Sequence, residues 1–340
     1  MSDSTLAISI LWGFVFIYAI MGSVDFGAGF WSMVYSKKNP EAASIANRFL
    51  SPSWEVTNVF LVLLVVALVG FFPRAAYLLG TLLLVPVSLV LVLLLFRSAF
   101  MVYAYSAKRY VRGLRLVSGL TGLLIPGLLV SVLPITLGGF IHMESGYPQL
   151  EYSELIASPT LYAHLGFGIL TELFLSALFL SDFSRQAGDE LTYRHYRLLA
   201  LITGPLALLL AFVATFTMEE EAGWIVNAMR EQYTWFMLSA AAFLAGYAAL
   251  WMKRRGQTGW PRLAFILILL QFALASYAYG KAHMPFIVFP FLTVDEGITN
   301  HLMFVSLLWG YAIGTAVLLP VFVLFWWLFL KDKRYVRAEE

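Results

Sequence analysis

The sequence is organised around Met21-Gly22-Ser23-Val24-Asp25-Phe26-Gly27-Ala28-Gly29-Phe30-Trp31, which lies near the end of the first long apolar segment. This stretch holds one carboxylate, Asp25, and no basic residue lies closer to it along the chain than Lys37. Gly22, Asp25 and Gly29 are spaced i, i+3 and i+7, so a helix places them on one face. A charge inside a membrane helix is energetically costly, and it therefore indicates a function or a buried partner. The small residues beside Asp25 would let another helix approach closely.

The composition predicts a protein that crosses a membrane many times. Of the 340 residues, 61% are hydrophobic and 12% are charged, about half the charged fraction of a soluble domain. The chain has no cysteine, which excludes disulfides, thiolate metal sites, iron–sulfur clusters and covalently attached haem. Residues 1–5 include Asp3 and no basic residue, unlike the start of a cleavable signal peptide, so we expect the first helix to be retained.

Nine apolar segments are long enough to cross a membrane, which takes about 20 apolar residues per helix. They span roughly residues 6–34, 54–72, 75–103, 114–141, 160–183, 197–217, 233–252, 261–280 and 298–330. The second and third are separated only by Phe72-Pro73-Arg74, where proline breaks the helix.

The basic residues predict the orientation of these helices. Eighteen of the 22 lysines and arginines fall in the loops after helices 1, 3, 5 and 7 or in the C-terminal tail. The opposite side has only Arg74, Arg230 and Lys281, while Arg97 lies inside the third helix. The positive-inside rule therefore places the N-terminus outside and the C-terminus in the cytoplasm.

The basic loops divide the helices into pairs, and a short motif that occurs twice in the sequence suggests two halves. Val24-Asp25-Phe26 ends the first helix and Ser181-Asp182-Phe183 ends the fifth, which has the same orientation. We therefore predict an all-α polytopic membrane protein with four-helix bundles at 1–141 and 160–280. A ninth helix and a basic tail follow at 298–340. The acidic outer loops are interpreted as solvated surface.

Three consecutive helices place polar residues in one layer of the cytoplasmic half. Ser51 is a candidate N-cap for the second helix and Pro52 suits its first position, which would put Glu55 in the first turn. Arg97 lies near the inner end of the third helix, level with Asp25. One interpretation is a buried Arg97–Asp25 ion pair that fixes helix packing. The other is proton uptake from the cytoplasm through Glu55 and Asp25, and the two can hold together.

The fifth predicted helix carries a second polar stripe. His164, Glu172 and Asp182 lie near one face of this helix, running from its outer end to its inner edge. The stripe is either a polar seam against a partner helix or subunit, or a path for protons or cations.

Haem ligation by this chain has little support in the sequence. Of the five histidines only His164 lies well inside a span, and the other four fall at helix ends or in loops: His142, His195, His283 and His301. The sequence shows no glycine-rich phosphate loop, nucleophile elbow or metal-site motif, and no nucleic-acid partner is expected.

Several short motifs, in this order along the chain, resemble the smaller, non-haem core subunit (subunit II) of cytochrome bd-type quinol oxidases. They are Asp25-Phe26-Gly27-Ala28-Gly29, Trp54-Glu55, Phe96-Arg97, Pro285-Phe286-Ile287-Val288-Phe289-Pro290 and Leu319-Pro320. The resemblance covers essentially the full length and agrees with nine helices and an outside N-terminus.

The chain departs from that family pattern near the head of the second helix. The family often has Trp-Asp-Gly-Asn where this chain has Trp54-Glu55-Val56-Thr57, and Phe60 stands in place of a tryptophan. A further acid often found just before the Asp25 motif is missing, and Gly22 lies in that area. Glu55 thus keeps the carboxyl group of the family's aspartate, on a side chain that is one methylene longer.

The resemblance implies a respiratory terminal oxidase in the prokaryotic cell membrane that oxidises quinol and reduces oxygen to water. A larger partner subunit would carry two b-type haems, one d-type haem and the quinol site, and this chain would carry none. This chain would support that subunit and supply cytoplasmic protons through Glu55 and Asp25. A structural quinone and a very small third subunit are further implications. The alternatives from the residues alone are a proton-coupled secondary transporter and a purely structural membrane subunit.

Overall fold

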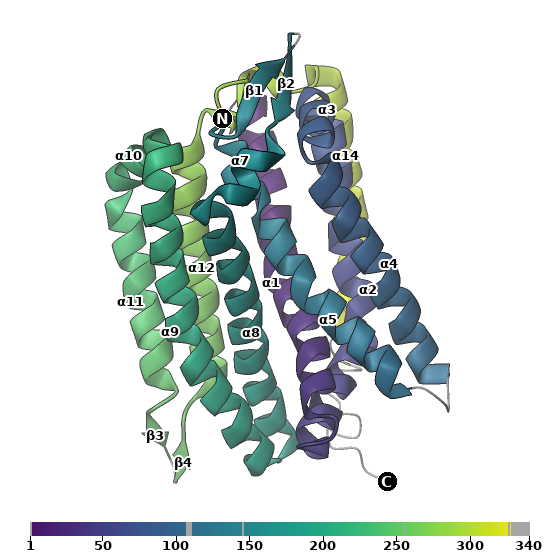
Figure 1. Ribbon diagram of the computed structural model, residues 1–340. Helices are drawn as coiled ribbons and strands as arrows, with labels where there is room; N and C mark the ends of the chain where they lie inside the picture. Colours follow the sequence, from purple (N-terminus) through teal and green to yellow (C-terminus); the bar gives the residue numbers. More distant parts are fainter. Residues whose placement is uncertain (1, 107–110, 145, 255, 326, 328–340) are drawn as a thin grey trace.

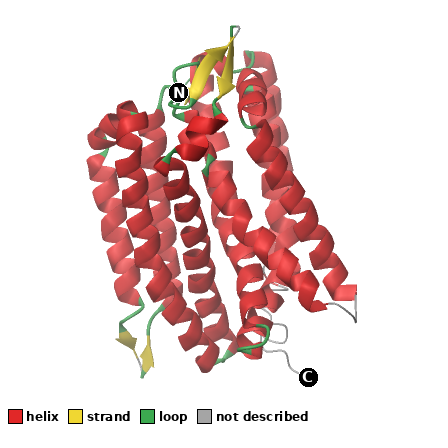
Figure 2. Cartoon of the chain, viewed as in Figure 1, coloured by secondary structure: helices red, strands yellow, loops and turns green. Residues whose placement is uncertain are grey.

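The computed structural model describes residues 2–106, 111–144, 146–254, 256–325 and 327, and within them the chain is almost entirely helical. The long helices run side by side along one axis (Figure 1). Figure 2 shows that the short strands lie at the two ends of this helical body. The basic residues Lys108, Arg109 and Arg255, and the tail from Lys331 onward, lie outside the described residues.

The first part of the chain forms seven helices and one β-hairpin. Their bounds are α1 Asp3–Tyr35, α2 Pro40–Phe71, α3 Pro73–Leu82, α4 Leu84–Ser106, α5 Val111–Val130, α6 Val132–Thr136, β1 Ile141–Glu144, β2 Tyr147–Leu150 and α7 Tyr152–Ala157. β1 and β2 pair antiparallel.

The second part forms seven more helices and two further hairpins. Their bounds are α8 Pro159–Ala187, α9 Glu190–Glu221, α10 Gly223–Glu231, α11 Tyr233–Ala249, β3 Lys253–Arg254, β4 Gln257–Thr258, α12 Pro261–His283, β5 Phe286–Val288, β6 Leu292–Thr293, α13 Val294–Gly297 and α14 His301–Phe325. Side-chain caps begin several of the long helices, because Ser2, Asn39, Ser158 and Asp189 each accept a backbone N–H of the following turn.

Among the described residues, seven helical stretches are long and apolar enough to cross a membrane. They are Asp3–Tyr35, Leu84–Tyr103, Gly113–Thr136, Pro159–Ala187, Glu190–Glu221, Pro261–His283 and His301–Leu324. The two other predicted segments correspond to α2, which is bent, and to α11, which is shorter than the other spans. The count of nine spans therefore stays a prediction.

The predicted start of the second helix was wrong. Helix α2 begins at Pro40, with the side chain of Asn39 accepting the amide of Ala42 at 3.2 Å, so residues 51–52 lie inside it. Proline lacks an amide hydrogen and cannot continue the helical hydrogen-bond ladder, so Pro52 in a helix interior favours a bend. The parts Pro40–Leu50 and Glu55–Phe71 do meet at an angle of 47°. Glu55 is consequently not in a first helical turn.

The predicted fourth segment, 114–141, also ends earlier as a helix than expected. Helix α6 stops at Thr136, and the chain then turns at Gly138 into strand β1. Gly138 has φ +86°, and a side chain there would overlap the backbone carbonyl of Phe289. Only glycine satisfies both demands, and this close approach ties the turn to the segment after α12.

The core joins the two predicted bundles along α1 and α8. Apolar residues of α1 such as Val24 and Trp31 share one buried cluster with Phe174 and Leu178 of α8. Helices α1, α5 and α8 pack against one another in pairs (Figure 1). The stretch around Asp25 therefore lies at a three-helix junction.

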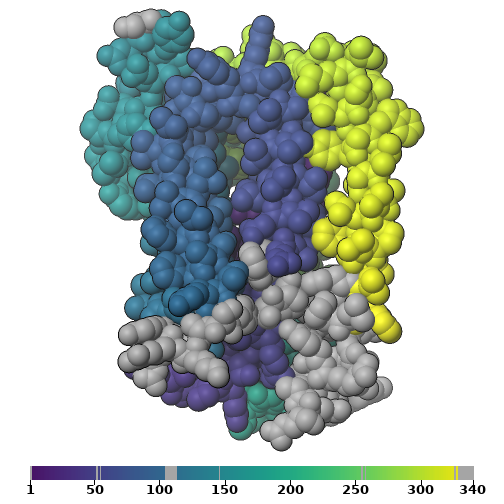
Figure 3. All heavy atoms as spheres, turned by 90° about the vertical axis from the view of Figure 1, so that its right-hand side faces the viewer, coloured from purple at the N-terminus to yellow at the C-terminus, as the bar shows by residue number. Residues whose placement is uncertain are grey.

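Helix α14 stands apart from this core. Phe304 at its start is buried against α2, but most of the helix beyond it is exposed within the chain. Figure 3 shows α14 as a separate yellow column beside α2, with an open hollow between the two.

Candidate proton-transfer site

The local packing around Asp25 follows from the small residues that surround it. Every residue from 22 to 29 is buried in the described structure. A side chain at Gly27 would overlap the hydroxyl of Ser176 on α8 and would lie 3.0 Å from the carbonyl oxygen of Glu172. The glycine therefore lets α1 and α8 come into backbone contact, and this contact buries Asp25 beside α8.

Asp25 is 2% exposed, and donors occupy both of its carboxylate oxygens. Arg97 Nη2 donates to Oδ2 at 2.8 Å, and Ser53 Oγ donates to Oδ1 at 2.9 Å. Arg97 Nη2 also lies 3.3 Å from the backbone oxygen of Asp25. Three helices, α1, α2 and α4, thus supply one hydrogen-bonded ion pair. Ser53 is marked in the sequence only by its position next to the Trp54-Glu55 motif.

The guanidinium of Arg97 lies beside an aromatic ring and two glycines. Its guanidinium carbon lies 4.5 Å from the centre of the Phe26 ring, a cation–π contact. Side chains at Gly29 and Gly122 would each come within 3.7 Å of the guanidinium. Arg97 is 3% exposed, and its Nε has no partner among the described residues. A buried arginine of this kind is tolerable only because Asp25 neutralises it.

Glu172 on α8 is the second buried carboxyl group of this region. It is 0% exposed, and neither of its carboxyl oxygens has a hydrogen-bond partner among the described residues. Glu172 is electrostatically coupled to Arg97 and to Asp25. The structure therefore brings Glu172 to the same junction as the ion pair, a proximity that spacing along one helix could not reveal.

Glu55 does not join this buried cluster. It is exposed on α2, and no hydrogen bond or ion pair connects it to another described residue. Residues two positions apart on a helix point to nearly opposite sides, so Glu55 faces away from Ser53 and Asp25. It heads an exposed apolar stripe of the same helix that continues through Val59, Val62, Val66 and Val69.

The members of the predicted second stripe lie in three different surroundings. His164 is buried, and its Nδ1 lies 2.8 Å from the carbonyl oxygen of Thr160. Glu172 faces the junction of α1, α5 and α8. Asp182 lies near the C-terminal end of α8, where Arg262 of α12 donates to its Oδ2 at 3.2 Å. Asp182 thus links α8 to α12, and the structure joins only Glu172 to the Asp25 layer.

Two other histidines form exposed pairs with acidic residues. His142 Nε2 lies 2.8 Å from Glu154, and His301 Nδ1 lies 2.5 Å from Asp3. No group of three His, Cys, Asp or Glu side chains in the described part of the chain could hold a metal ion.

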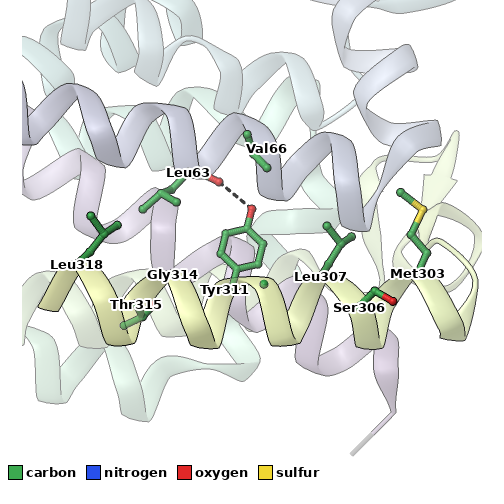
Figure 4. Close-up of a pocket in the computed structure, with 10 residues that line it drawn as sticks. Leu63, Val66, Met303, Ser306, Leu307, Tyr311, Gly314, Thr315 and Leu318 are labelled. Carbon is green, nitrogen blue, oxygen red and sulfur yellow. Dashed lines mark hydrogen bonds between the residues drawn. The ribbon is translucent and has the colours of Figure 1, made fainter.

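An apolar groove of about 410 Å³ lies between α2 and α14, away from the charged cluster. Its lining includes Leu63, Leu307 and Leu318 (Figure 4). The hydroxyl of Tyr311 points across the groove and donates to the carbonyl oxygen of Leu63 at 3.2 Å. The groove offers shape and apolar surface but no ionisable group suited to proton transfer.

Comparison with known proteins identifies relatives over nearly the whole chain. The family described as cytochrome bd terminal oxidase subunit II matches residues 4–329. A putative cytochrome bd menaquinol oxidase subunit II of Bacillus subtilis (strain 168) is 48% identical over 343 residues, covering 100% of this chain and 99% of that protein. A chain of the bd oxidase structure from Geobacillus thermodenitrificans has a TM-score of 0.80 and 35% identity, covering 98% of this chain and 100% of that one.

These matches define the class: a multi-pass bacterial membrane subunit of a respiratory oxidoreductase complex. The chain belongs to the cytochrome bd terminal oxidase subunit II family. A larger subunit I is accordingly its partner, and the haems of the complex are assigned to that partner. Membership in an oxidoreductase family leaves the transporter alternative without support.

Proposed function

We propose that this chain is the non-haem subunit of a quinol:oxygen oxidoreductase that reduces oxygen to water, and that it supplies cytoplasmic protons through Glu55 and Asp25. Menaquinol is the proposed electron donor of the complex, because the relative from Bacillus subtilis is described as a menaquinol oxidase subunit. Two b-type haems and one d-type haem would lie on the larger subunit, which this chain supports. A structural quinone and a very small third subunit belong to the proposal on family resemblance alone.

The proposed topology has nine spans, an outside N-terminus and a cytoplasmic C-terminus. The segments 1–141 and 160–280 would be two four-helix halves, followed by the ninth helix and tail at 298–340. The sorting of basic residues supports this orientation, since 18 of 22 lie on the proposed cytoplasmic side. The proposal places Asp25, Ser53 and Arg97 in the inner half of the membrane.

The observation that carries the proton-supply role is the buried Asp25–Arg97 pair with Ser53 bound to its free oxygen. Helix α2 carries Ser53 on its buried face and Glu55 on its exposed face, so one helix connects a surface acid to the buried acid. A proton collected at Glu55 would pass around α2 to reach Asp25. Carboxylates inside membranes often serve as such relays.

The test is the variant Glu55→Gln in the assembled complex. We expect quinol-driven oxygen reduction to fall about tenfold, equivalent to about 1.4 kcal/mol of barrier. Haem content should stay unchanged, because Glu55 is exposed and supports no described contact. Glu144→Gln on the outer hairpin is the matched control and should keep the full rate. Full turnover with full proton uptake in Glu55→Gln would defeat the proton-uptake role.

A further inference from the structure

The buried cluster at the junction of α1, α5 and α8 does not balance in charge. It contains one guanidinium, that of Arg97, and two carboxyl groups, those of Asp25 and Glu172, and each of the three residues is at most 3% exposed. With both acids ionised the cluster would carry one uncompensated negative charge. An uncompensated charge in a dry interior is strongly unfavourable, and such groups neutralise instead. One bound proton makes the cluster neutral.

The hydrogen bonds indicate which of the two acids holds that proton. Both oxygens of Asp25 accept donors, from Arg97 at 2.8 Å and from Ser53 at 2.9 Å, and such a pattern favours the ionised form. Neither oxygen of Glu172 has a donor among the described residues. A buried carboxyl group without donors is better tolerated neutral than charged. In this arrangement the proton belongs on Glu172.

The surroundings of Glu172 offer no other charge to compensate it. Of the helices packed around α8, the stretch 198–218 of α9, the stretch 263–280 of α12 and the stretch 116–136 of α5 and α6 contain no charged residue. Helix α2 brings Ser53 to Asp25. The ionisable groups that face the junction are thus Asp25 and Tyr18 from α1 and Arg97 from α4.

We propose that Glu172 is a proton-holding group of the oxidase, which exchanges one proton with Asp25 while Arg97 pairs with whichever acid is ionised. In the arrangement described here Arg97 pairs with Asp25 and the proton rests on Glu172. When Arg97 turns to Glu172, the proton moves from the Glu172 carboxyl group to the Asp25 carboxylate, and the net charge stays zero. The cluster thereby stores a proton inside the membrane. This inference rests on the proposed function and adds a group that the Glu55–Asp25 path does not contain.

The experiment compares Glu172→Gln with Glu172→Asp in the intact two-subunit complex. Glutamine keeps the shape of the side chain but cannot carry the proton, whereas aspartate carries it on a shorter side chain. We expect Glu172→Gln to slow oxygen reduction about tenfold, and Glu172→Asp to recover most of the rate. Infrared difference spectra between oxidised and reduced complex should show a protonated carboxyl band that is lost in Glu172→Gln.

A purely structural role predicts the opposite order. Glutamine would then match or exceed aspartate, because aspartate leaves a small void in the packed junction. That order, or a spectrum in which Glu172→Gln removes no carboxyl band, would overturn the proposal. Glu154→Gln, an exposed acid of the outer surface, is the control for the loss of a carboxylate. If Glu172→Gln slows oxygen reduction and Glu55→Gln does not, Glu172 holds a proton and Glu55 is not the entrance. If only Glu55→Gln slows oxygen reduction, Glu55 is the entrance and the proposal for Glu172 fails.

Discussion

At the scale of single residues, the Asp25–Arg97 pair shows how a membrane interior tolerates charge. Each partner alone would be an ion in a dry environment, and together they form a short, hydrogen-bonded pair. The ring of Phe26 lies against the guanidinium and Ser53 donates to the second carboxylate oxygen, so both oxygens of Asp25 have donors. The pair therefore contributes to helix packing whatever else it does.

Removing either partner should destabilise the complex strongly. We expect Arg97→Ala to cost about 3–5 kcal/mol, because it leaves Asp25 buried and unpaired. Asp25→Asn should act in the same direction, and both should lower the haem content of the complex, measured by its absorbance relative to protein. Ser53→Ala removes one hydrogen bond to a charged group and should cost only about 2 kcal/mol. Thermal unfolding of the purified complex measures all three, and an unchanged haem content in Arg97→Ala would contradict the expectation.

The sequence could predict Asp25 and Arg97 because a charge within a long apolar run is conspicuous and demands a partner. It could not predict that Glu172 lies at the same junction, since that proximity depends on Gly27 letting α8 approach α1. The sequence also could not predict on which face of the second helix Glu55 lies. That face depends on where α2 begins, and Asn39-Pro40 and Ser51-Pro52 are both pairs of the kind that begins a helix, of which the structure uses the first.

At the scale of secondary-structure elements, the contact of α1 with α8 depends on the absence of a side chain at Gly27. Gly27→Ala would force Ser176 and the backbone of α8 away from α1. We expect a loss of about 1–3 kcal/mol, the usual effect of overpacking a tight interior. The complex should dissociate at a lower temperature, which size-exclusion chromatography after heating can measure.

The matched control lies on the same helix. Gly13→Ala meets no atom within 4 Å, and it should be neutral or stabilising by up to about 1 kcal/mol through helix propensity. A Gly27→Ala complex as stable as the Gly13→Ala complex would show that the α1–α8 contact has room to adjust.

Long apolar segments were predictable at this scale because their length alone marks them. The ends of these segments were harder to predict. The turn at Gly138 depends on the close approach of the Phe289 backbone, a contact between distant segments that local propensity does not reveal. Proline within a helix was equally ambiguous, since Pro40 begins α2 whereas Pro126 and Pro205 lie inside helices.

At the scale of the whole molecule, the lack of cysteine makes the proposed orientation directly testable. Tyr147 on the β1–β2 hairpin and Met252 beside β3 are both exposed and lie at opposite ends of the molecule (Figure 1). In intact cells Tyr147→Cys should react with a membrane-impermeant maleimide, whereas Met252→Cys should react only after the cells are opened. The converse labelling pattern would invert the proposed topology and remove the cytoplasmic source of protons.

The separate position of α14 has a consequence for the order in which the molecule is built. Among the described helices, α14 is translated after all the others, and it contributes no side chain to the printed contacts of Asp25, Arg97 or Ser53. Every described partner in those contacts has already been synthesised when His301 leaves the ribosome. The contacts among Asp25, Arg97 and Ser53 can therefore form during biosynthesis, before α14 has been inserted.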